Sequence, residues 1–223
     1  MTLKPYCLVL IATLFIGIKP IFSQHCNCRA EPELKSIINC KPVYFKNGAK
    51  LFWQYNCDSS WLVFKNNHWV RRVIFSMEFV DLTGRLGFSY AQENKHSFTI
   101  ENRQISGCCA PLQYRLFDKE TGRQLRDFGD CIWYSNESLY NFLLYFIEGS
   151  DHKIRFYFID KEKYLDLTIP KGRFKSDQSD APELAFEDAN IEKGRFKIFY
   201  RYQLPKQKET WLKDSIIVDL SRY

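Results

Sequence analysis

The sequence predicts an all-β fold, either an antiparallel β-sandwich or an open barrel, on three observations. Aromatic residues make up 17% of the chain, with 19 Phe and 13 Tyr, and such side chains favour half-buried strands. Several segments alternate apolar and polar residues with a period of two, which is typical of antiparallel strands with one face in water. Turn signals containing Gly or Asn separate these segments about every ten residues, a spacing that suits a sandwich or a barrel.

Four hairpins are expected in chain order, each closed by a turn in which Gly or Asn can adopt a positive φ. Their turns are Asn47-Gly48, Asn66-Asn67, Lys119 to Gly122, and Glu148 to Lys153. The strands that these turns join are residues 43–45 and 51–55, 61–64 and 69–74, 114–117 and 125–128, and 142–147 and 154–159.

Further strands are expected at residues 164–169 and 195–202, which alternate with a period of two. Residues 142–147 are apolar on both faces and therefore predict a central strand. Helical signals are weak and limited to a turn or two at residues 31–38 and 136–141. Residues 176–190 are polar and acidic, and they predict a surface loop with a short helix that starts at Pro182.

The first 23 residues have the order of a secretory signal peptide. Lys4 is followed by an apolar run over residues 7–18 and by Ser23 at the expected cleavage site. The run is shorter than the roughly 20 residues that a membrane span needs, and no later segment is long and apolar enough to span a bilayer. The sequence therefore predicts a signal peptide (1–23) and a single β domain (24–223), with a candidate sub-boundary near 131–136. The predicted location is secreted or periplasmic.

The charge pattern argues against a nucleic-acid partner. Removal of the signal peptide, with Lys4 and Lys19, would leave 30 basic and 26 acidic residues, a net charge of +4. These charges are interspersed, whereas nucleic-acid-binding proteins concentrate basic residues in a patch or stripe.

Seven cysteines follow the predicted cleavage site, so disulfides are the default expectation for an exported chain and at least one thiol is left over. They are Cys26, Cys28, Cys40, Cys57, Cys108, Cys109 and Cys131. All lie before residue 132, so the predicted fold is tied by disulfides in its N-terminal half only.

Two pairings follow from the expected hairpins. A four-residue loop from Asn47 to Lys50 would place Cys40 opposite Cys57, and opposed residues of antiparallel strands are close enough for a disulfide. The hairpin centred near Thr121 would place Cys131 almost opposite Cys109, with Cys108 as the alternative partner. The sequence therefore predicts the disulfides Cys40–Cys57 and Cys109–Cys131.

The sequence contains no recognisable catalytic motif. Its four histidines lack metal-binding or catalytic spacing, and no phosphate loop or nucleophile elbow is present. Cys26 and Cys28 after His25 resemble metal ligands but lack a second ligand pair. Acidic residues such as Asp160 and Asp166 could serve a hydrolase, but so could many others. We therefore predict no catalytic residue, no metal and no cofactor.

Tryptophans give the most specific functional hypothesis. Trp53, Trp61 and Trp69 fall eight residues apart on three successive expected strands, so their rings could line one face, and Arg71 could add a charged contact. Such a face would suit ligand recognition, and the alternative is a Trp-rich core. The predicted function is a secreted or periplasmic, non-catalytic binding module for a protein or a glycan, of inhibitor or immunity type. The alternatives are a secreted hydrolase acting on polysaccharide or peptide, and a structural component of an envelope assembly.

The signal peptide generates the first testable prediction. We expect the exported protein to begin at Gln24 or within a few residues of it, because the charged, apolar and small-residue segments end at Ser23. Intact mass or N-terminal sequencing of the exported protein measures this. Recovery of a chain that retains Met1 only in the cytosol would contradict both the location and the disulfide expectation.

Overall fold

The computed structural model describes residues 32–78, 87–103, 110–137, 139–171, 173, 181–203 and 210–223. These residues are nearly all β and their sheets are antiparallel, as the sequence predicts. The strands form three sheets. The predicted signal peptide lies outside the described residues, and so do Cys26, Cys28, Cys108 and Cys109.

Each sheet is a meander in which strands that follow one another in the chain pair with one another. The first sheet follows the short helix α2 (Leu34–Ile37) and contains β1 (Val43–Tyr44), β2 (Lys50–Tyr55), β3 (Ser59–Lys65) and β4 (Arg71–Glu78). The second contains β5 (Gly87–Glu93), β6 (Ser97–Arg103), β7 (Leu112–Asp118), β8 (Gln124–Asn136), β9 (Asn141–Phe146), β10 (Lys153–Phe158) and, after the 3-10 turn η2 (Ile159–Lys161), β11 (Lys163–Thr168). The third follows the 3-10 turn η3 (Pro182–Ala185) and contains β12 (Phe186–Glu192), β13 (Arg195–Tyr202) and β14 (Leu212–Asp219).

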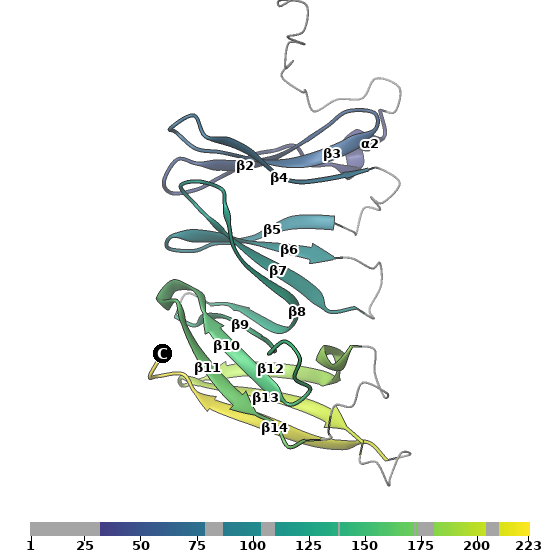
Figure 1. Ribbon diagram of the computed structural model, residues 1–223, viewed down its shortest axis with the longest axis vertical. Helices are drawn as coiled ribbons and strands as arrows, with labels where there is room; N and C mark the ends of the chain where they lie inside the picture. The colour runs from purple at the N-terminus through teal and green to yellow at the C-terminus, as the bar shows by residue number, and fades with distance from the viewer. Residues whose placement is uncertain are drawn as a thin grey trace, which may run out of the picture.

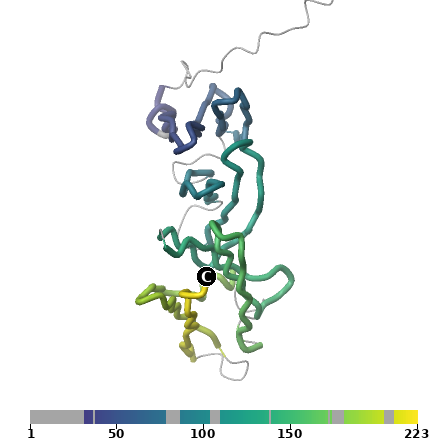
Figure 2. The backbone as a smooth tube through the Cα atoms, turned by 90° about the vertical axis from the view of Figure 1, so that its left-hand side faces the viewer, coloured from purple at the N-terminus to yellow at the C-terminus, as the bar shows by residue number. Residues whose placement is uncertain are grey.

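The three sheets are stacked along the long axis of the molecule, with the second sheet in the middle (Figure 1). The first sheet packs on one end of the second through an upper core, and the third packs near the other end through a lower core. The view turned by 90° shows the same elongated order (Figure 2). The upper core contains Phe45, Leu51, Leu62, Phe64, Phe98, Ile100 and Phe117, and the lower core contains Phe142, Leu144, Ile154, Phe156, Phe196 and Ile198.

A third cluster lies on the opposite face of the second sheet. Leu143 and Tyr157 belong to this inner cluster, whereas their chain neighbours Phe142 and Phe156 belong to the lower core. Successive side chains of a strand point to opposite faces, so the inner cluster lies on the face away from the lower core. Tyr114 of β7 and Tyr157 of β10 share this cluster although two strands separate them, which shows that the second sheet curves around it.

The turn between β7 and β8 holds the first sheet against the second. Lys119 in this turn is only 7% exposed, and its Nζ lies 2.7 Å from Glu93 Oε1 and 2.9 Å from the carbonyl oxygen of Asn94. Asn47 of the β1–β2 turn donates to the carbonyl oxygen of Lys119, and Asn66 after β3 donates to that of Glu120. This turn therefore joins two turns of the first sheet to the start of the second.

The predicted register of the first hairpin is wrong by three residues. Val43 pairs with Leu51, whereas the prediction paired Lys46 with Leu51. The turn is shorter than expected: the Phe45 N–H donates to the carbonyl oxygen of Ala49, and Gly48 takes the positive φ that closes it. The geometric argument for the disulfide Cys40–Cys57 therefore falls, and that pairing stays a prediction.

The predicted disulfide between Cys131 and Cys109 or Cys108 is wrong, because Cys131 is a free, buried thiol. It pairs with Leu112 on β7 and belongs to the inner cluster. Bulges between Tyr114 and Arg115 and between Leu116 and Phe117 shift the register of this hairpin. Period-two patterning does not reveal such bulges, since they insert single residues.

Other local predictions have mixed outcomes. The hairpin between β7 and β8 is confirmed, and a 3-10 turn does start at Pro182. Residues 186–192 form strand β12, so the prediction of a loop there is wrong. Between the end of β8 at Asn136 and the start of β9 at Asn141, the Tyr140 N–H donates to the carbonyl oxygen of Glu137, which closes a single turn, and the described residues there form no helix.

The contact between the β7–β8 turn and the first sheet can be tested at Gly122. This residue has a φ of +63°, and an added Cβ would lie 2.4 Å from Cδ1 of the buried Phe64. We expect Gly122→Ala to lower the free energy of unfolding by about 3 kcal/mol, combining a left-handed φ with overpacking. Urea unfolding followed by tryptophan fluorescence measures the loss.

Gly149→Ala is the matched control for this prediction. Gly149 also has a positive φ, of +73°, but an added Cβ would meet nothing within 4 Å. Gly149→Ala should lower the free energy of unfolding only by the cost of the left-handed φ, about 1–2 kcal/mol. Equal losses for the two variants would contradict the close packing of the turn on Phe64.

Candidate binding site

Trp69 is the most unusual residue on the surface of the described chain. Its side chain is 85% exposed, and its backbone has a φ of +63° in the turn between β3 and β4. A bulky residue at a left-handed φ is an outlier that costs about 1–2 kcal/mol. Asn66 holds the turn, since its Oδ1 accepts hydrogen bonds from the N–H groups of His68 and Val70. The side chain of Trp69 is exposed and its backbone conformation is strained, so Trp69 contributes little to the stability of the fold. Such strain favours a functional role.

A row of cations crosses the first sheet beside Trp69. Tyr44 pairs with Lys50, Lys50 with Lys65, and Lys65 with Arg71. Directly paired residues project from the same face of a sheet, and neighbouring strands are about 4.8 Å apart. We call Tyr44, Lys50, Lys65, Trp69 and Arg71 the basic face.

The cations of the basic face have no acidic partner among the described residues. The ion pairs of this part of the chain all lie elsewhere. Like charges on directly opposed strand positions destabilise a sheet. The row therefore produces a local positive potential that the fold does not neutralise, which suits an acidic ligand.

The rings and the ammonium groups of the basic face alternate in space. Lys65 Nζ lies 5.2 Å from the centroid of the Trp69 ring, and Lys50 Nζ lies 5.9 Å from that of Tyr44, which is itself 68% exposed. These groups surround a hollow of about 300 Å³, lined by Tyr44, Gly48, Lys50, Lys65, Asn66, Asn67 and Trp69. The hollow offers ammonium donors, amide groups and ring faces, which can bind an anionic group together with an adjoining flat or apolar surface.

The structure brings together only part of the predicted tryptophan platform. Trp53 is paired with Leu62 and packs against the upper core, so it points away from the basic face. Trp61 projects on the same side as Lys65 but is only 5% exposed, and its indole N–H donates to Gln54. Trp69 lies in a turn before β4 rather than on a strand. Of the predicted binding residues, Trp69 and Arg71 therefore belong to the basic face, and the three rings do not share an exposed surface.

Sequence reasoning missed Tyr44, Lys50 and Lys65. Their signal is the pairing register of two hairpins. A three-residue loop at Asn47-Gly48 makes Tyr44 and Lys50 opposed, and the register of the β2–β3 hairpin makes Lys50 and Lys65 opposed.

The acidic residues considered for a hydrolase are engaged in structural contacts. Asp166 forms an ion pair with Arg155, which lowers the pKa of the Asp166 carboxyl. Asp160 accepts hydrogen bonds from the Lys95 N–H and from Asn141. Burial and the nearby Asp130 raise the pKa of the Cys131 thiol, so it is protonated at neutral pH and is a poor nucleophile.

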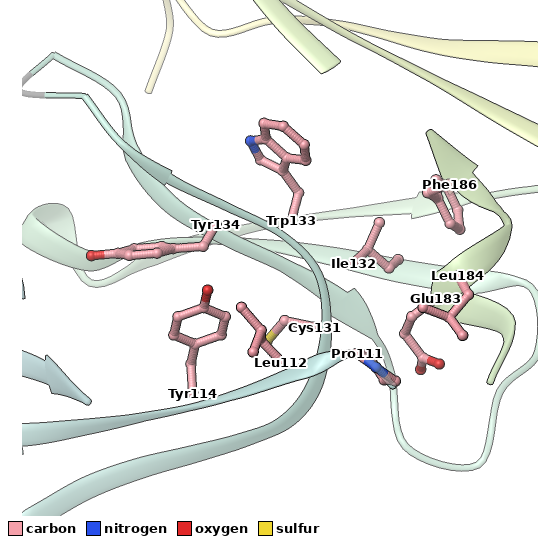
Figure 3. Close-up of a pocket in the computed structure, with 10 residues that line it drawn as sticks. All are labelled: Pro111, Leu112, Tyr114, Cys131, Ile132, Trp133, Tyr134, Glu183, Leu184 and Phe186. Carbon is pink, nitrogen blue, oxygen red and sulfur yellow. The ribbon is translucent and has the colours of Figure 1, made fainter. Parts of the chain in front are cut away.

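A second hollow, of about 340 Å³, lies between the second sheet and the start of the third (Figure 3). Its ten lining residues include one carboxylate, Glu183, and four aromatic residues. They are Pro111, Leu112, Tyr114, Cys131, Ile132, Trp133, Tyr134, Glu183, Leu184 and Phe186.

Comparison with known proteins identifies no relative: no protein-family model, no curated protein and no solved structure matches this chain. Within the described ranges, His, Cys, Asp and Glu form no group of three or more that could hold a metal ion. In the same part of the chain, the helices are too short or too polar to cross a membrane.

The backbone strain at Trp69 leads to a prediction about stability. We expect Trp69→Gly to leave the free energy of unfolding within about 1 kcal/mol of the original protein, or to raise it. Glycine relieves the left-handed φ, and the exposed ring loses only a cation–π contact with Lys65. Thermal and urea unfolding measure this. Trp61→Gly is the contrast: Trp61 is buried, so this substitution should lower the free energy of unfolding by about 3–5 kcal/mol. A comparable loss for Trp69→Gly would show that Trp69 supports the fold.

Proposed function

We propose that this chain is an exported, non-catalytic binding module that recognises an acidic protein or an acidic glycan through the basic face. The observation that carries the proposal is Trp69, an 85% exposed tryptophan on a strained turn beside three cations that have no acidic partner among the described residues. Exposed Trp and Arg residues dominate the energetics of recognition surfaces. The export part of the proposal rests on the charged and apolar segments of residues 1–23.

The geometry of the basic face supports recognition by contact rather than by chemistry. The side chains of the basic face are ammonium, guanidinium and aromatic groups, and its hollow adds the amides of Asn66 and Asn67. Such groups hold an anion and stack on a flat surface. None of them is a carboxylate or a thiol that could act as general base or nucleophile.

The covalent framework and the sheet arrangement complete the proposal. We infer that disulfides tie the N-terminal half, because neither Cys40 nor Cys57 is a free thiol. We also infer that the first sheet and the β5–β7 end of the second act as a sandwich-like support, since the upper core fills the space between them. Such a support would hold the basic face rigid on its outer side.

Binding to defined acidic probes tests the function. The probes are a sulfated heparin oligosaccharide, a poly-glutamate peptide and an uncharged dextran oligosaccharide, titrated into the protein by calorimetry at two salt concentrations. We expect one of the two acidic probes to bind and the uncharged probe to bind at least about tenfold more weakly, since the charges of the face are uncompensated. Affinity should fall as salt rises, because exposed charges are screened.

Variants locate the site. Trp69→Gly and the double variant Lys50→Gln/Lys65→Gln should each weaken binding by about tenfold or more. Matched controls lie on the third sheet: Trp211 is also exposed and faces a cation, Arg201, and Lys197 and Lys213 flank Phe199. Trp211→Ala and Lys197→Gln/Lys213→Gln should therefore bind normally. Failure of both acidic probes to bind, or equal effects of the two sets of variants, would overturn the proposal.

A further inference from the structure

The strands at the ends of the three sheets differ in how well their free edges are protected. A free edge presents backbone N–H and C=O groups that can pair with a further strand. β1 is only two residues long, and β4, β5 and β12 each have a register shift against the neighbouring strand, which hinders further pairing. β14 differs, because it pairs with β13 over eight consecutive residues without a shift. It runs along the lower end of the molecule, away from the first sheet (Figure 1).

Alternate backbone groups of β14 point away from β13, which is its single partner among the described strands. The Leu220 N–H donates to the carbonyl oxygen of Gly194, and these two residues continue the register of the two strands. Hydrogen-bonded and non-hydrogen-bonded pairs alternate in an antiparallel ladder, so the edge-facing residues are Lys213, Ser215, Ile217 and Asp219. The Ser215 N–H agrees with this assignment, because it donates to the side chain of Asp214.

The same four residues project from the outer face of the third sheet. Their neighbours Ile216 and Val218 face the lower core, and successive side chains of a strand point to opposite faces. Ile217 therefore lies on the solvent side, and it is 62% exposed. A long, flat edge strand with an exposed apolar residue is a predicted site of strand pairing.

The sequence of β14 is complementary to itself. In an antiparallel copy centred on Ile216, Lys213 lies opposite Asp219 of the second copy, once on each side of the two-fold axis. Opposite charges at directly opposed positions stabilise a strand pair. Ile216 meets its own copy on the inner face, and the two Ile217 side chains become diagonal neighbours on the outer face, about 7–8 Å apart. One pairing therefore satisfies the free backbone groups, the two charges and the exposed isoleucine together.

β11 is the other regular edge, but it lacks this complementarity. It has six residues, and the Ile169 N–H donates to the carbonyl oxygen of His152, which marks the hydrogen-bonded pairs of β10 and β11. The edge-facing residues are then Tyr164, Asp166 and Thr168. A two-fold axis at the middle one would oppose Asp166 to its own copy, and like charges destabilise a strand pair.

We propose that β14 binds the same strand of a second copy of this chain, which joins the two third sheets into one continuous antiparallel sheet. The interface is isologous, since each copy contributes the same strand. A second copy fits better than a foreign strand, because the charges of β14 complement themselves. The dimer carries one basic face at each far end, since the first sheet and β14 lie at opposite ends of the molecule (Figure 1). The interface is separate from the basic face, so either proposal can fail without the other.

Sedimentation velocity of the full exported chain over a range of concentrations tests the dimer. One edge strand forms a small interface, so we expect a reversible dimer with a Kd of roughly 10–100 µM. Ile217→Pro removes an edge-facing N–H without removing a hydrogen bond to β13, and should weaken the dimer by at least about tenfold. Thr168→Pro makes the same change at the edge of β11 and should leave the dimer unchanged. A chain that stays monomeric up to about 1 mM, or equal effects of the two proline variants, would overturn the proposal.

Two charge reversals test the register without proline. In the homodimer, Lys213→Asp opposes two carboxylates and Asp219→Lys opposes two ammonium groups, so each variant alone should dimerise at least about tenfold more weakly. An equimolar mixture of the two variants should recover the dimer, because each carboxylate then faces an ammonium group. Lys213 also lies 2.8 Å from Glu187 of its own chain, but the mixture does not restore that contact, so recovery is specific to the interface. A mixture that stays monomeric, with both variants folded by thermal unfolding, would refute this pairing of β14.

Calorimetry with the acidic probes separates this proposal from that of the basic face. Ile217→Pro and the original chain should bind the probe with equal affinity per chain, because each basic face binds on its own. A monomeric chain that binds the probe would remove only the dimer, whereas a dimer that binds no acidic probe would remove only the proposed function.

Discussion

The buried ion pair between Lys119 and Glu93 is the interaction on which the position of the basic face depends. The side chains are only 9% and 14% exposed, and Glu93 Oε1 also accepts the N–H of Lys46. Three turns, those of β1–β2, β5–β6 and β7–β8, therefore meet at one charge pair. Loss of one partner of a buried pair typically costs about 3–5 kcal/mol. It would also release the turn that carries Gly48 and leads into Lys50, and so would displace one wall of the hollow beside Trp69.

The basic face contains groups that cost folding free energy. On the basic face these are the left-handed φ of Trp69 and the opposed Lys50 and Lys65. Other charged groups on the sheets form ion pairs, as Arg155 does with Asp166 and Glu187 with Arg201. Groups that cost folding free energy on one exposed surface are typical of functional positions.

The binding residues were only partly predictable, because register decides which side chains meet. Trp69 and Arg71 could be found from local sequence alone. Tyr44 and Lys50 become neighbours only when the first turn has three loop residues, and Lys50 and Lys65 only in the observed register of the β2–β3 hairpin, since each added residue slips the pairing. The bulge between Leu62 and Val63, and those in β7–β8, shift pairing further. The Cys131 prediction failed for this reason, and no period-two pattern shows where a bulge falls.

The sequence by itself determined the strands, the turns and their chain order. Alternation of apolar and polar residues specifies a pleated, half-buried segment wherever it occurs, and Gly or Asn at a turn admits a positive φ. Only the tertiary structure decided that the strands divide into three stacked sheets, and that Trp61 is buried while Trp69 is exposed. The reason is that these facts depend on contacts between distant segments. Asn66 donates to the carbonyl oxygen of Glu120, 54 residues further along the chain, and such a contact arises from the packing of one sheet on another, which leaves no local pattern in the sequence.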